Sequence, residues 1–283
     1  VKVLVTGAAG QLGTDVVASA GSTGDDAVAV DRATLDITDV EAVDECIAEV
    51  RPDAVINCAA FTAVDRCETE VETAHEVNEH GVRFLATACG RVGAHLVHVS
   101  TDYVFDGTLD RPYREDDPTN PQSVYGVSKL AGERAAMDVL GDGVTIVRTS
   151  WVCGEHGQNM VKLVRRLATE GSAMAFVDDQ RGCPSFTADL SPALRWLAAE
   201  RPGGVVHLTN SGAVSWYEFV REILAMSGHD PDLVTPIATR DLNPPRPAPR
   251  PANSVLDHVG WVELGQRPLR DFRHPLRELV SLL

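Results

Sequence analysis

The chain has 283 residues, of which 44% are apolar, and its 41 acidic and 25 basic side chains give a formal net charge of −16. This is the composition of a folded globular protein rather than of a disordered or fibrous one. The acidic excess disfavours binding to nucleic acid and to anionic membrane surfaces.

No apolar run approaches the roughly 20 residues that a membrane span needs, and the N-terminus lacks the pattern of a secretion signal. We therefore expect a cytoplasmic location. The six cysteines are scattered without CxxC pairs, so we expect small core residues rather than a metal or redox site.

Short apolar segments alternate with helical patterns over the first 150 residues. Strands are expected at 2–6, 27–31, 54–58, 96–100 and 144–148, and helices at 11–20, 40–51, 70–91 and 125–139. Each strand is nearly continuously apolar, as strands covered on both faces are. The alternation predicts an α/β fold with a doubly wound parallel sheet.

Residues 151–283 are expected to form mainly a smaller, mixed C-terminal substrate-binding lobe, although the chain can cross back between the lobes. Helices are expected at 160–170, 188–199 and 216–226, and strands at 173–177 and 205–208. Six of the 16 prolines fall within residues 236–251, which predicts an extended loop there.

A glycine-rich turn, TGAAGQLG from Thr6 to Gly13, follows the first strand with the spacing GxxGxxG. Such a turn lets the backbone approach a pyrophosphate, whose charge is met by amides at the helix N-terminus. A glycine turn can also be purely structural. Its position after the first strand favours a Rossmann-type dinucleotide-binding domain over residues 1–150.

Further features follow at the same edge of the predicted sheet. Asp31, at the end of the second strand, can accept ribose hydroxyls of NAD(H), whereas Arg32 would suit the 2′-phosphate of NADP(H). Asp36 and Ile37 follow where a side chain could reach the adenine, and small residues at 57–60 would let a cofactor pass over the third strand. The expected cofactor is NADH or NADPH, and a solvated Asp31 is the structural alternative.

The strongest pattern follows the fourth strand, where Thr101 lies in STDYVFDG and YGVSK, from Tyr125 to Lys129, opens the next helix. Tyr125 and Lys129 share one helix face. An ammonium beside a phenol lowers the phenol's pKa toward the range useful for proton transfer, and the Thr101 hydroxyl can donate to a carbonyl oxygen. The group predicts proton transfer at an alcohol oxygen during hydride transfer. An exposed Tyr and Lys on a surface helix are the alternative.

These motifs resemble the extended short-chain dehydrogenase/reductase superfamily, and further strings resemble its dTDP-4-dehydrorhamnose reductase family. The strings are STDYVFDG, NPQSVYGVSKLAGE (120–133), RTSWV (148–152), DDQRGCPS (178–185) and RPANSVLD (250–257). With the glycine turn they extend over nearly the whole chain. The resemblance implies an oxidoreductase that uses NADH or NADPH to reduce the C4 keto group of a nucleotide-linked 4-keto-6-deoxy sugar, in activated deoxysugar biosynthesis.

The resemblance also implies roles for individual residues. Tyr125 would protonate O4 of the sugar, while Lys129 would tune Tyr125 and hold the nicotinamide ribose. Thr101 would polarise the keto group and Tyr103 would adjust the proton affinity of the site. The cofactor would contact Gly7, Gly10, Gln11, Leu12, Gly13, Asp31, Arg32, Asp36, Ile37, Ala59, Ala60, Thr62, Tyr125 and Lys129. The substrate would contact Thr101, Asp102, Tyr103, Phe105, Trp151, Asn159 and Arg250.

Two alternative functions stay open. A nucleotide-sugar epimerase or 4,6-dehydratase shares this fold, but a dehydratase usually has an acidic pair after the threonine, and here Asp102 is followed by Tyr103. A non-catalytic NAD(P)-binding regulatory subunit would have no need of the intact Thr101, Tyr125 and Lys129.

This sequence departs from the family pattern at positions that bear on metal binding, dimerisation and the identity of the sugar substrate. Some family members are dimers in which glutamates hold Mg²⁺ at the interface. In the corresponding region Glu263 and Glu278 show no spacing of a cation site, so no metal is predicted and a homodimer stays open. Phe61 and Cys153 replace residues familiar beside the pocket, which leaves the identity of the sugar open.

Only three lysines, Lys2, Lys129 and Lys162, occur beside the acidic excess. Anionic ligands must then be bound by helix N-terminal amides and a few placed cations. The combination predicts a halophilic protein from a salt-rich cytoplasm, where the Debye length is roughly 3 Å at ~1 M salt.

Overall fold

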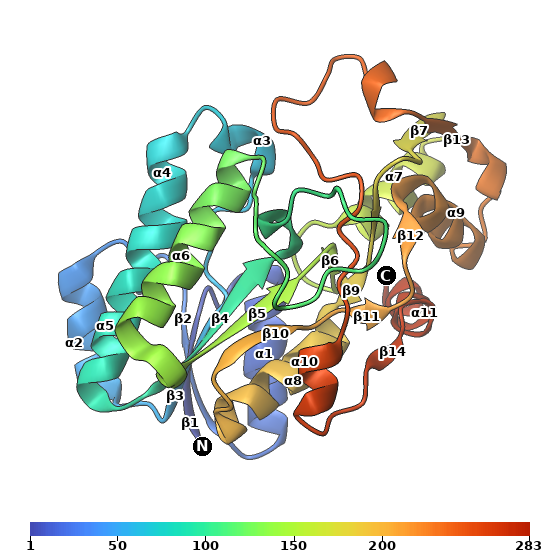
Figure 1. The fold of residues 1–283 in the computed structure, drawn as a ribbon. Helices are drawn as coiled ribbons and strands as arrows, with labels where there is room; N and C mark the ends of the chain where they lie inside the picture. Colours follow the sequence, from blue (N-terminus) through green and yellow to red (C-terminus); the bar gives the residue numbers. More distant parts are fainter.

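The protein is described from a computed structural model of residues Val1–Leu283, built around a six-stranded parallel sheet with the strand order β10-β5-β4-β3-β1-β2 (Figure 1). The strands are β1 (Lys2–Thr6), β2 (Asp26–Val30), β3 (Ala54–Asn57), β4 (His95–Thr101), β5 (Val144–Thr149) and β10 (Gly204–His207). The predicted α/β fold with a doubly wound parallel sheet is confirmed. Because each of the first five strands is a continuous apolar run, each lies close to its expected range.

Helices cover both faces of the sheet. On one face are α2 (Val40–Val50), α5 (Gly81–Val92) and α6 (Val124–Leu140), and on the other are α1 (Gln11–Ser22) and α8 (Thr187–Glu200). Alternate residues of a strand enter opposite cores: Leu4 packs in the core under α2 and α5, and Val3 and Val5 pack in the core under α1 and α8. The two buried faces explain why the strands read as continuously apolar.

The single helix expected at 70–91 is interrupted. The structure has α3 (Val64–Cys67), α4 (Val71–His75), a π-helical turn (Glu76–His80) and then α5. The cause is buried Asn78, whose Oδ1 accepts from the Phe61 amide at 2.8 Å and whose Nδ2 donates to Ser128 Oγ at 3.1 Å. Gly132 on α6 leaves room for this turn, because a Cβ there would lie 2.0 Å from the Asn78 carbonyl oxygen.

The second part of the chain builds a smaller lobe and also returns to the main sheet. The lobe contains β6 (Val152–Cys153), α7 (Met160–Thr169), β7 (Met174–Val177), β8 (Arg181–Gly182), β9 (Ser185–Phe186), β11 (Asn210–Ser211), β12 (Val214–Ser215), α9 (Trp216–Met226), β13 (Val234–Ile237), β14 (Leu269–Asp271) and α11 (Arg273–Leu282). The short helix α10 (Val259–Glu263) instead packs against β10 of the main sheet. The expected strand at 205–208 does not belong to this lobe. It is β10, which pairs with β5, while α8 packs against α1, because Val206, Leu190 and Leu194 complete the core of the main sheet.

The proline-rich segment runs from the end of β13 back across the top of the molecule toward α3 (Figure 1). It has one short 3-10 turn, Thr239–Asp241, and no helix or strand between that turn and Pro251. None of the helices has the length and apolar character needed to cross a membrane.

Candidate active site

The glycine-rich turn joins β1 to α1. Gly7 has a φ of +66°, and a Cβ on it would lie 2.7 Å from the backbone nitrogen of Ala59. A Cβ on Gly13 would lie 2.3 Å from the carbonyl oxygen of Gly7. Both positions therefore require glycine on steric grounds. No side chain caps the first amides of α1 after Gly10, so these N–H groups can bind an anionic group.

A cavity of about 410 Å³ opens beside this turn. Its lining includes the predicted cofactor residues Gly7, Gly10, Asp31, Arg32, Asp36, Ile37, Ala59 and Ala60. It also includes Cys58 and Phe61, which the sequence places beside the cofactor path, and residues that the sequence did not single out: Ala9, Leu35, Arg66, Glu70, Thr73 and Val77. Several of these come from the segment of α3, α4 and the π-helical turn, which lies at the cavity through tertiary contacts and carries no motif. The glycine turn, the uncapped amides and the position at the carboxyl ends of parallel strands fit a dinucleotide.

Asp31 and Arg32 both line this cavity. Oδ1 of Asp31 accepts hydrogen bonds from the hydroxyl and amide of Thr34, at 3.0 and 3.1 Å. These bonds lower the pKa of the Asp31 carboxyl. The exposed guanidinium of Arg32 lies 3.5 Å from Asp36. The cavity therefore offers a carboxylate for ribose hydroxyls and a cation for a 2′-phosphate side by side.

Some predicted residues lie elsewhere. Gln11, Leu12, Gly13, Thr62, Tyr125 and Lys129 do not line the cavity, and Leu12 packs against the core under α1. Asn159, predicted to bind substrate, caps α7 by accepting from the Lys162 amide at 3.2 Å. Its Nδ2 donates to Gln11 Oε1 at 2.7 Å, and Gln11 donates to the Val152 carbonyl at 2.9 Å. Asn159 and Gln11 therefore tie the smaller lobe to the glycine turn.

Thr101, Tyr103 and Tyr125 come together where β4 ends and α6 begins. The rings of Tyr103 and Tyr125 meet edge to face with centroids 5.5 Å apart, and the Tyr103 amide donates to Thr101 Oγ1 at 3.2 Å. Gly126 permits this approach, because a Cβ there would lie 2.3 Å from the Tyr103 carbonyl oxygen. Ser123 fixes the start of α6 by accepting from the Gly126 amide at 3.2 Å.

Both phenols are protonated at neutral pH. Tyr125 is 9% exposed, and burial raises its pKa above the ordinary value although a hydrogen bond with Thr101 opposes the shift. Burial also raises the pKa of Tyr103 to about 12. The predicted lowering of the Tyr125 pKa by Lys129 is therefore wrong for this structure. Nζ of Lys129 instead donates to the Val99 carbonyl at 2.7 Å and lies 3.3 Å from Nε2 of His98, inside the protein.

Asp102 binds the hydroxyl that was predicted to polarise the substrate. Thr101 Oγ1 donates to Oδ1 of Asp102 at 3.0 Å. Asp102 is 2% exposed, and burial raises the pKa of its carboxyl to about 6. To donate to a substrate carbonyl, the Thr101 hydroxyl must rotate away from Asp102.

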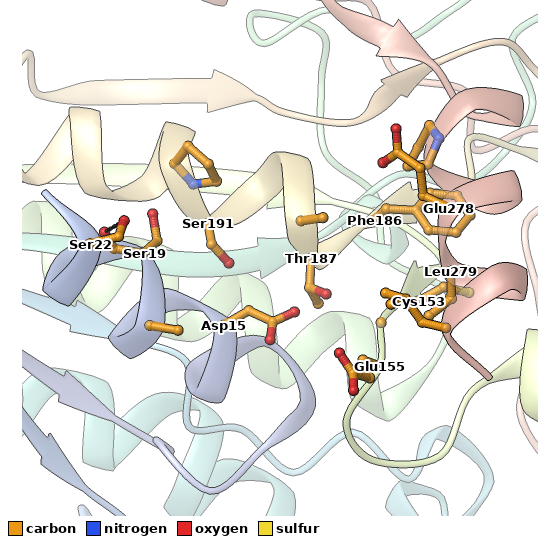
Figure 2. Close-up of a pocket in the computed structure, with 16 residues that line it drawn as sticks. Asp15, Ser19, Ser22, Cys153, Glu155, Phe186, Thr187, Ser191, Glu278 and Leu279 are labelled. Atoms are coloured by element: carbon orange, nitrogen blue, oxygen red, sulfur yellow. Dashed lines mark hydrogen bonds between the residues drawn. The ribbon is translucent and has the colours of Figure 1, made fainter.

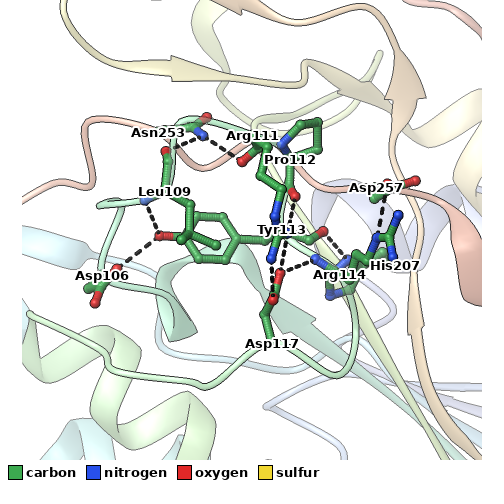
Figure 3. A network of polar contacts seen from close by, with 10 residues as sticks. All are labelled: Asp106, Leu109, Arg111, Pro112, Tyr113, Arg114, Asp117, His207, Asn253 and Asp257. Atoms are coloured by element: carbon green, nitrogen blue, oxygen red, sulfur yellow. Dashed lines mark hydrogen bonds and ion pairs between the residues drawn. The ribbon is translucent and has the colours of Figure 1, made fainter.

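Phe105 was predicted to contact the substrate, but it lies in the core and is 1% exposed. Its ring stacks on Tyr113 with centroids 4.3 Å apart, and the Arg148 guanidinium lies 5.2 Å from its ring centroid. Figure 3 shows how Tyr113 is held: its hydroxyl donates to Asp106 at 2.9 Å, and its carbonyl lies 3.1 Å from the His207 ring. Phe105 therefore supports the loop after β4 rather than lining a binding site.

Trp151 follows β5 at the same edge of the sheet, two residues after Thr149, which pairs with Thr101. Its φ is +48°, a strained conformation for a residue other than glycine. Its indole stacks on that of Trp216 with centroids 3.5 Å apart and planes 11° from parallel. Gly182 makes room for this ring, since a Cβ there would lie 2.7 Å from it.

Arg250, predicted to bind the nucleotide diphosphate, is engaged by Asp65 on α3. Arg250 Nη2 donates to Asp65 Oδ2 at 2.8 Å, and the Ala248 amide donates to Asp65 Oδ1 at 3.2 Å. These bonds fasten the proline-rich segment to the dinucleotide side of the molecule. Arg250 and Arg246 both lie close enough to Tyr103 to act against the rise in its pKa.

A second cavity, of about 430 Å³, lies between α1, α8 and α11 (Figure 2). Asp15, Glu155 and Glu278 line it, and none of the predicted site residues does. Arg270 donates to Glu278 at 2.6 Å and to Asp189 at 3.0 Å. The Glu278 carboxylate is thus paired with a guanidinium, and no group of three metal-ligating side chains is present.

Comparison with known proteins connects the whole chain to one group. The family model described as RmlD substrate binding domain matches residues 1–283. A dTDP-4-dehydrorhamnose reductase from Streptomyces griseus is 46% identical over 99% of this chain and 93% of the relative. A dTDP-4-keto-6-deoxy-D-glucose reductase from Streptomyces niveus is 40% identical over 99% of this chain and 96% of the relative. A solved dTDP-4-dehydrorhamnose reductase from Bacillus anthracis, in complex with NADP, superposes with a TM-score of 0.95 at 34% identity, with 99% of each chain covered.

Proposed function

The chain belongs to the RmlD substrate binding domain family, and we propose that it reduces the C4 keto group of a dTDP-linked 4-keto-6-deoxy sugar with NADH or NADPH. The names of the two relatives support a dTDP-linked 4-keto sugar. The NADP complex of the Bacillus anthracis relative and the carboxylate and guanidinium at the cavity support a nicotinamide cofactor of either kind. The two relatives differ in the sugar they are named for, so the proposal is for the class of substrate.

The observation that carries the proposal is the protonated phenol of Tyr125 next to Thr101. Reduction of a ketone needs a proton for the oxygen as hydride reaches the carbon, and a buried phenol with a raised pKa still holds its proton at neutral pH. Thr101 stabilises charge on the same oxygen once its hydroxyl turns from Asp102. The nicotinamide cofactor supplies the hydride, and the glycine turn and cavity orient it.

Substrate binding is proposed for residues around this group. Trp151 offers an indole face to the sugar, and Tyr103 lies edge on to the proton donor. Arg246 and Arg250 are proposed as the cations that bind the diphosphate. Arg250 must either bind Asp65 and the diphosphate together or leave Asp65 to bind the diphosphate. Gly7, Gly10, Asp31 and Ala59 are proposed to contact the cofactor.

The test is the Tyr125→Phe variant, assayed on a small panel of dTDP-4-keto-6-deoxy sugars with each cofactor and with product identification. We expect kcat to fall by about 10²–10⁴, the usual contribution of a proton donor. Cofactor binding, measured by titration calorimetry, is expected to stay close to that of the unmodified protein. Tyr217→Phe, which removes a phenol hydroxyl on α9, is the matched control. Near-unchanged turnover in Tyr125→Phe would exclude the proposed proton donor.

We also propose a location and conditions for this reaction. The six cysteines are free thiols, which fits a reducing compartment such as the cytoplasm. The charge of −16 with three lysines supports a salt-rich cytoplasm. A homodimer stays a prediction, which sedimentation of the purified protein will test.

A further inference from the structure

Four buried polar side chains form a row from the first strand of the sheet to Lys129. Thr6 pairs in register with Asn57, and Asn57 pairs with His98, on three adjacent strands. The Thr6 hydroxyl donates to Asn57 Oδ1 at 2.7 Å, and Asn57 Nδ2 lies 3.0 Å from His98 Nδ1. His98 Nε2 lies 3.3 Å from Lys129 Nζ. Thr6, Asn57 and His98 are fully buried and Lys129 is 1% exposed, so water does not complete these contacts.

One backbone amide fixes the direction of the whole row. The Ala59 N–H donates to Oδ1 of Asn57 at 3.0 Å, and an N–H can only donate. Oδ1 is therefore the carbonyl oxygen, and the amide NH₂ of Asn57 faces His98. His98 Nδ1 must accept that hydrogen bond, so the proton of the neutral imidazole is on Nε2. Burial, with the charge of Lys129 as a smaller cause, holds the pKa of His98 well below its ordinary value, so the ring is neutral.

We propose that Asn57 and His98 are positioning residues. They direct an imidazole N–H at Nζ of Lys129 and thereby lower the proton affinity of the Lys129 amine. A neutral amine accepts from His98 and donates to the Val99 carbonyl, and every polar atom is paired. An ammonium in the same place would face the imidazole N–H. This contact between two donors could be removed only if the side-chain amide of Asn57 rotated by 180°, so that His98 could change tautomer. That rotation would break the hydrogen bonds of Asn57 with Ala59 and Thr6.

The other groups facing Lys129 do not remove this effect. Glu133, one turn further along α6, raises the pKa of Lys129, but its carboxylate is shared with Arg148 at 2.7 Å. The Cys58 thiol beside the amine has a pKa raised to about 12 by burial and stays neutral. Tyr125, one turn before, is also neutral. Burial is the largest influence and lowers the pKa of Lys129 to about 8.

The consequence for catalysis rests on the proposed function. An amine that loses its proton near neutral pH carries no positive charge that would lower the pKa of Tyr125. The phenol therefore remains protonated and can act as the acid that a reductase needs. The pH profile of kcat/KM should then contain the ionisation of Lys129. Replacing Asn57 by Asp changes the tautomer of His98. The carboxylate still accepts from Ala59 and Thr6, but it also accepts from Nδ1–H of His98. Nε2 is then free to accept from a Lys129 ammonium.

The experiment titrates Lys129 directly by NMR of protein labelled with ¹³C at lysine Cε. The chain has only three lysines, and Lys129→Arg identifies the signal. In Asn57→Asp we expect the titration midpoint of Lys129 to rise by about one to three pH units, the usual effect of a new acceptor and charge. In His98→Met, which removes the imidazole N–H and has no donor to direct at Lys129, we expect a smaller rise. No substrate is needed, so failure of the proposed function leaves the titration valid.

His95→Gln is the matched control. His95 is also a buried histidine of β4, bonded to Thr145 Oγ1 at 2.8 Å and not to Lys129, and we expect an unchanged Lys129 midpoint. If Asn57→Asp does not fold, the Lys129 midpoint in His98→Met decides between the outcomes. An unchanged or lowered midpoint in the folded variants, or an equal rise in His95→Gln, overturns the proposal. An active enzyme should show the same shift in its kcat/KM profile.

Discussion

Asp102 carries its charge at a cost to folding. Burial raises the pKa of its carboxyl from 3.8 to about 6, so folding favours the protonated form. The stabilisation by the neutral carboxyl is complete below pH 3.8 and is lost as the pH rises through about 6. Asp102→Asn is neutral at every pH, and its amide oxygen can keep the bond from Thr101. We expect the free energy of unfolding of this variant, relative to that of the unmodified protein, to increase by up to about 3 kcal/mol between pH 4 and pH 7.

Asp106→Asn is the control of opposite sign. Hydrogen bonds from Thr108, Asn120 and Tyr113 lower the pKa of Asp106 to about 2, so its charged form stabilises the fold above pH 3.8. Between pH 4 and pH 7 this variant should therefore be less stable than the unmodified protein by a nearly constant amount, and the difference should shrink only as the pH falls from 3.8 through about 2. Parallel changes in the two variants would contradict both assignments. Calorimetry at a series of pH values measures them.

Single residues of the site are predictable from the sequence, but their hydrogen bonds are not. A spacing of four places Tyr125 and Lys129 on one face of any helix. The partners of Lys129 are His98 and Val99, which lie about 30 residues away, and no local pattern contains that information. The family resemblance implied a substrate contact for Phe105, but its ring stacks on Tyr113 and lies against the Arg148 guanidinium in the core.

At the scale of elements, the contact of α6 with the π-helical turn sets the position of the proton donor. Gly132→Ala would place a Cβ 2.0 Å from the Asn78 carbonyl oxygen, so α6 or the turn must move. We expect a loss of about 1–3 kcal/mol in unfolding free energy, the usual cost of overpacking, and a fall in kcat. Denaturant unfolding and steady-state kinetics measure the two effects.

Gly90→Ala on α5 is the matched control, because a Cβ there meets only Leu140 Cδ2 at 3.4 Å. Alanine favours a helix over glycine by about 1 kcal/mol, so this variant should be as stable as the unmodified protein or more so. If both variants behave alike, the close contact of Gly132 does not hold α6 in place.

The elements of the sheet were predictable because each buried strand is an apolar run between turn residues. The π-helical turn was not, because Asn78 departs from α-helical bonding only through its contacts with Phe61 and Ser128. The role of β10 was also missed. Its residues have the same apolar pattern in either lobe, and only its pairing with β5 decides the lobe.

For the molecule as a whole, the charge of −16 predicts a dependence on salt. Repulsion between acidic groups acts over about 10 Å at 0.1 M salt and about 3 Å at 1 M. We expect melting temperature and activity to rise between about 0.1 M and about 2 M KCl, with NaCl as the control for an effect specific to one cation. Ion pairs such as Arg32–Asp36, Arg66–Glu70 and Arg240–Asp241 are exposed, and their screening should cost little stability. A protein equally stable and active at both concentrations is not adapted to salt.

The four tryptophans can serve as spectroscopic probes of the protein interior. The four residues form two pairs, Trp151 stacked on Trp216 and Trp196 set at 86° to Trp261. The second pair belongs to the core under α1 and α8, whereas Trp151 packs against the core of the smaller lobe. Stacked indoles couple their electronic transitions, so a sugar that inserts against Trp151 alters the near-ultraviolet spectrum of one pair and leaves the other as an internal standard.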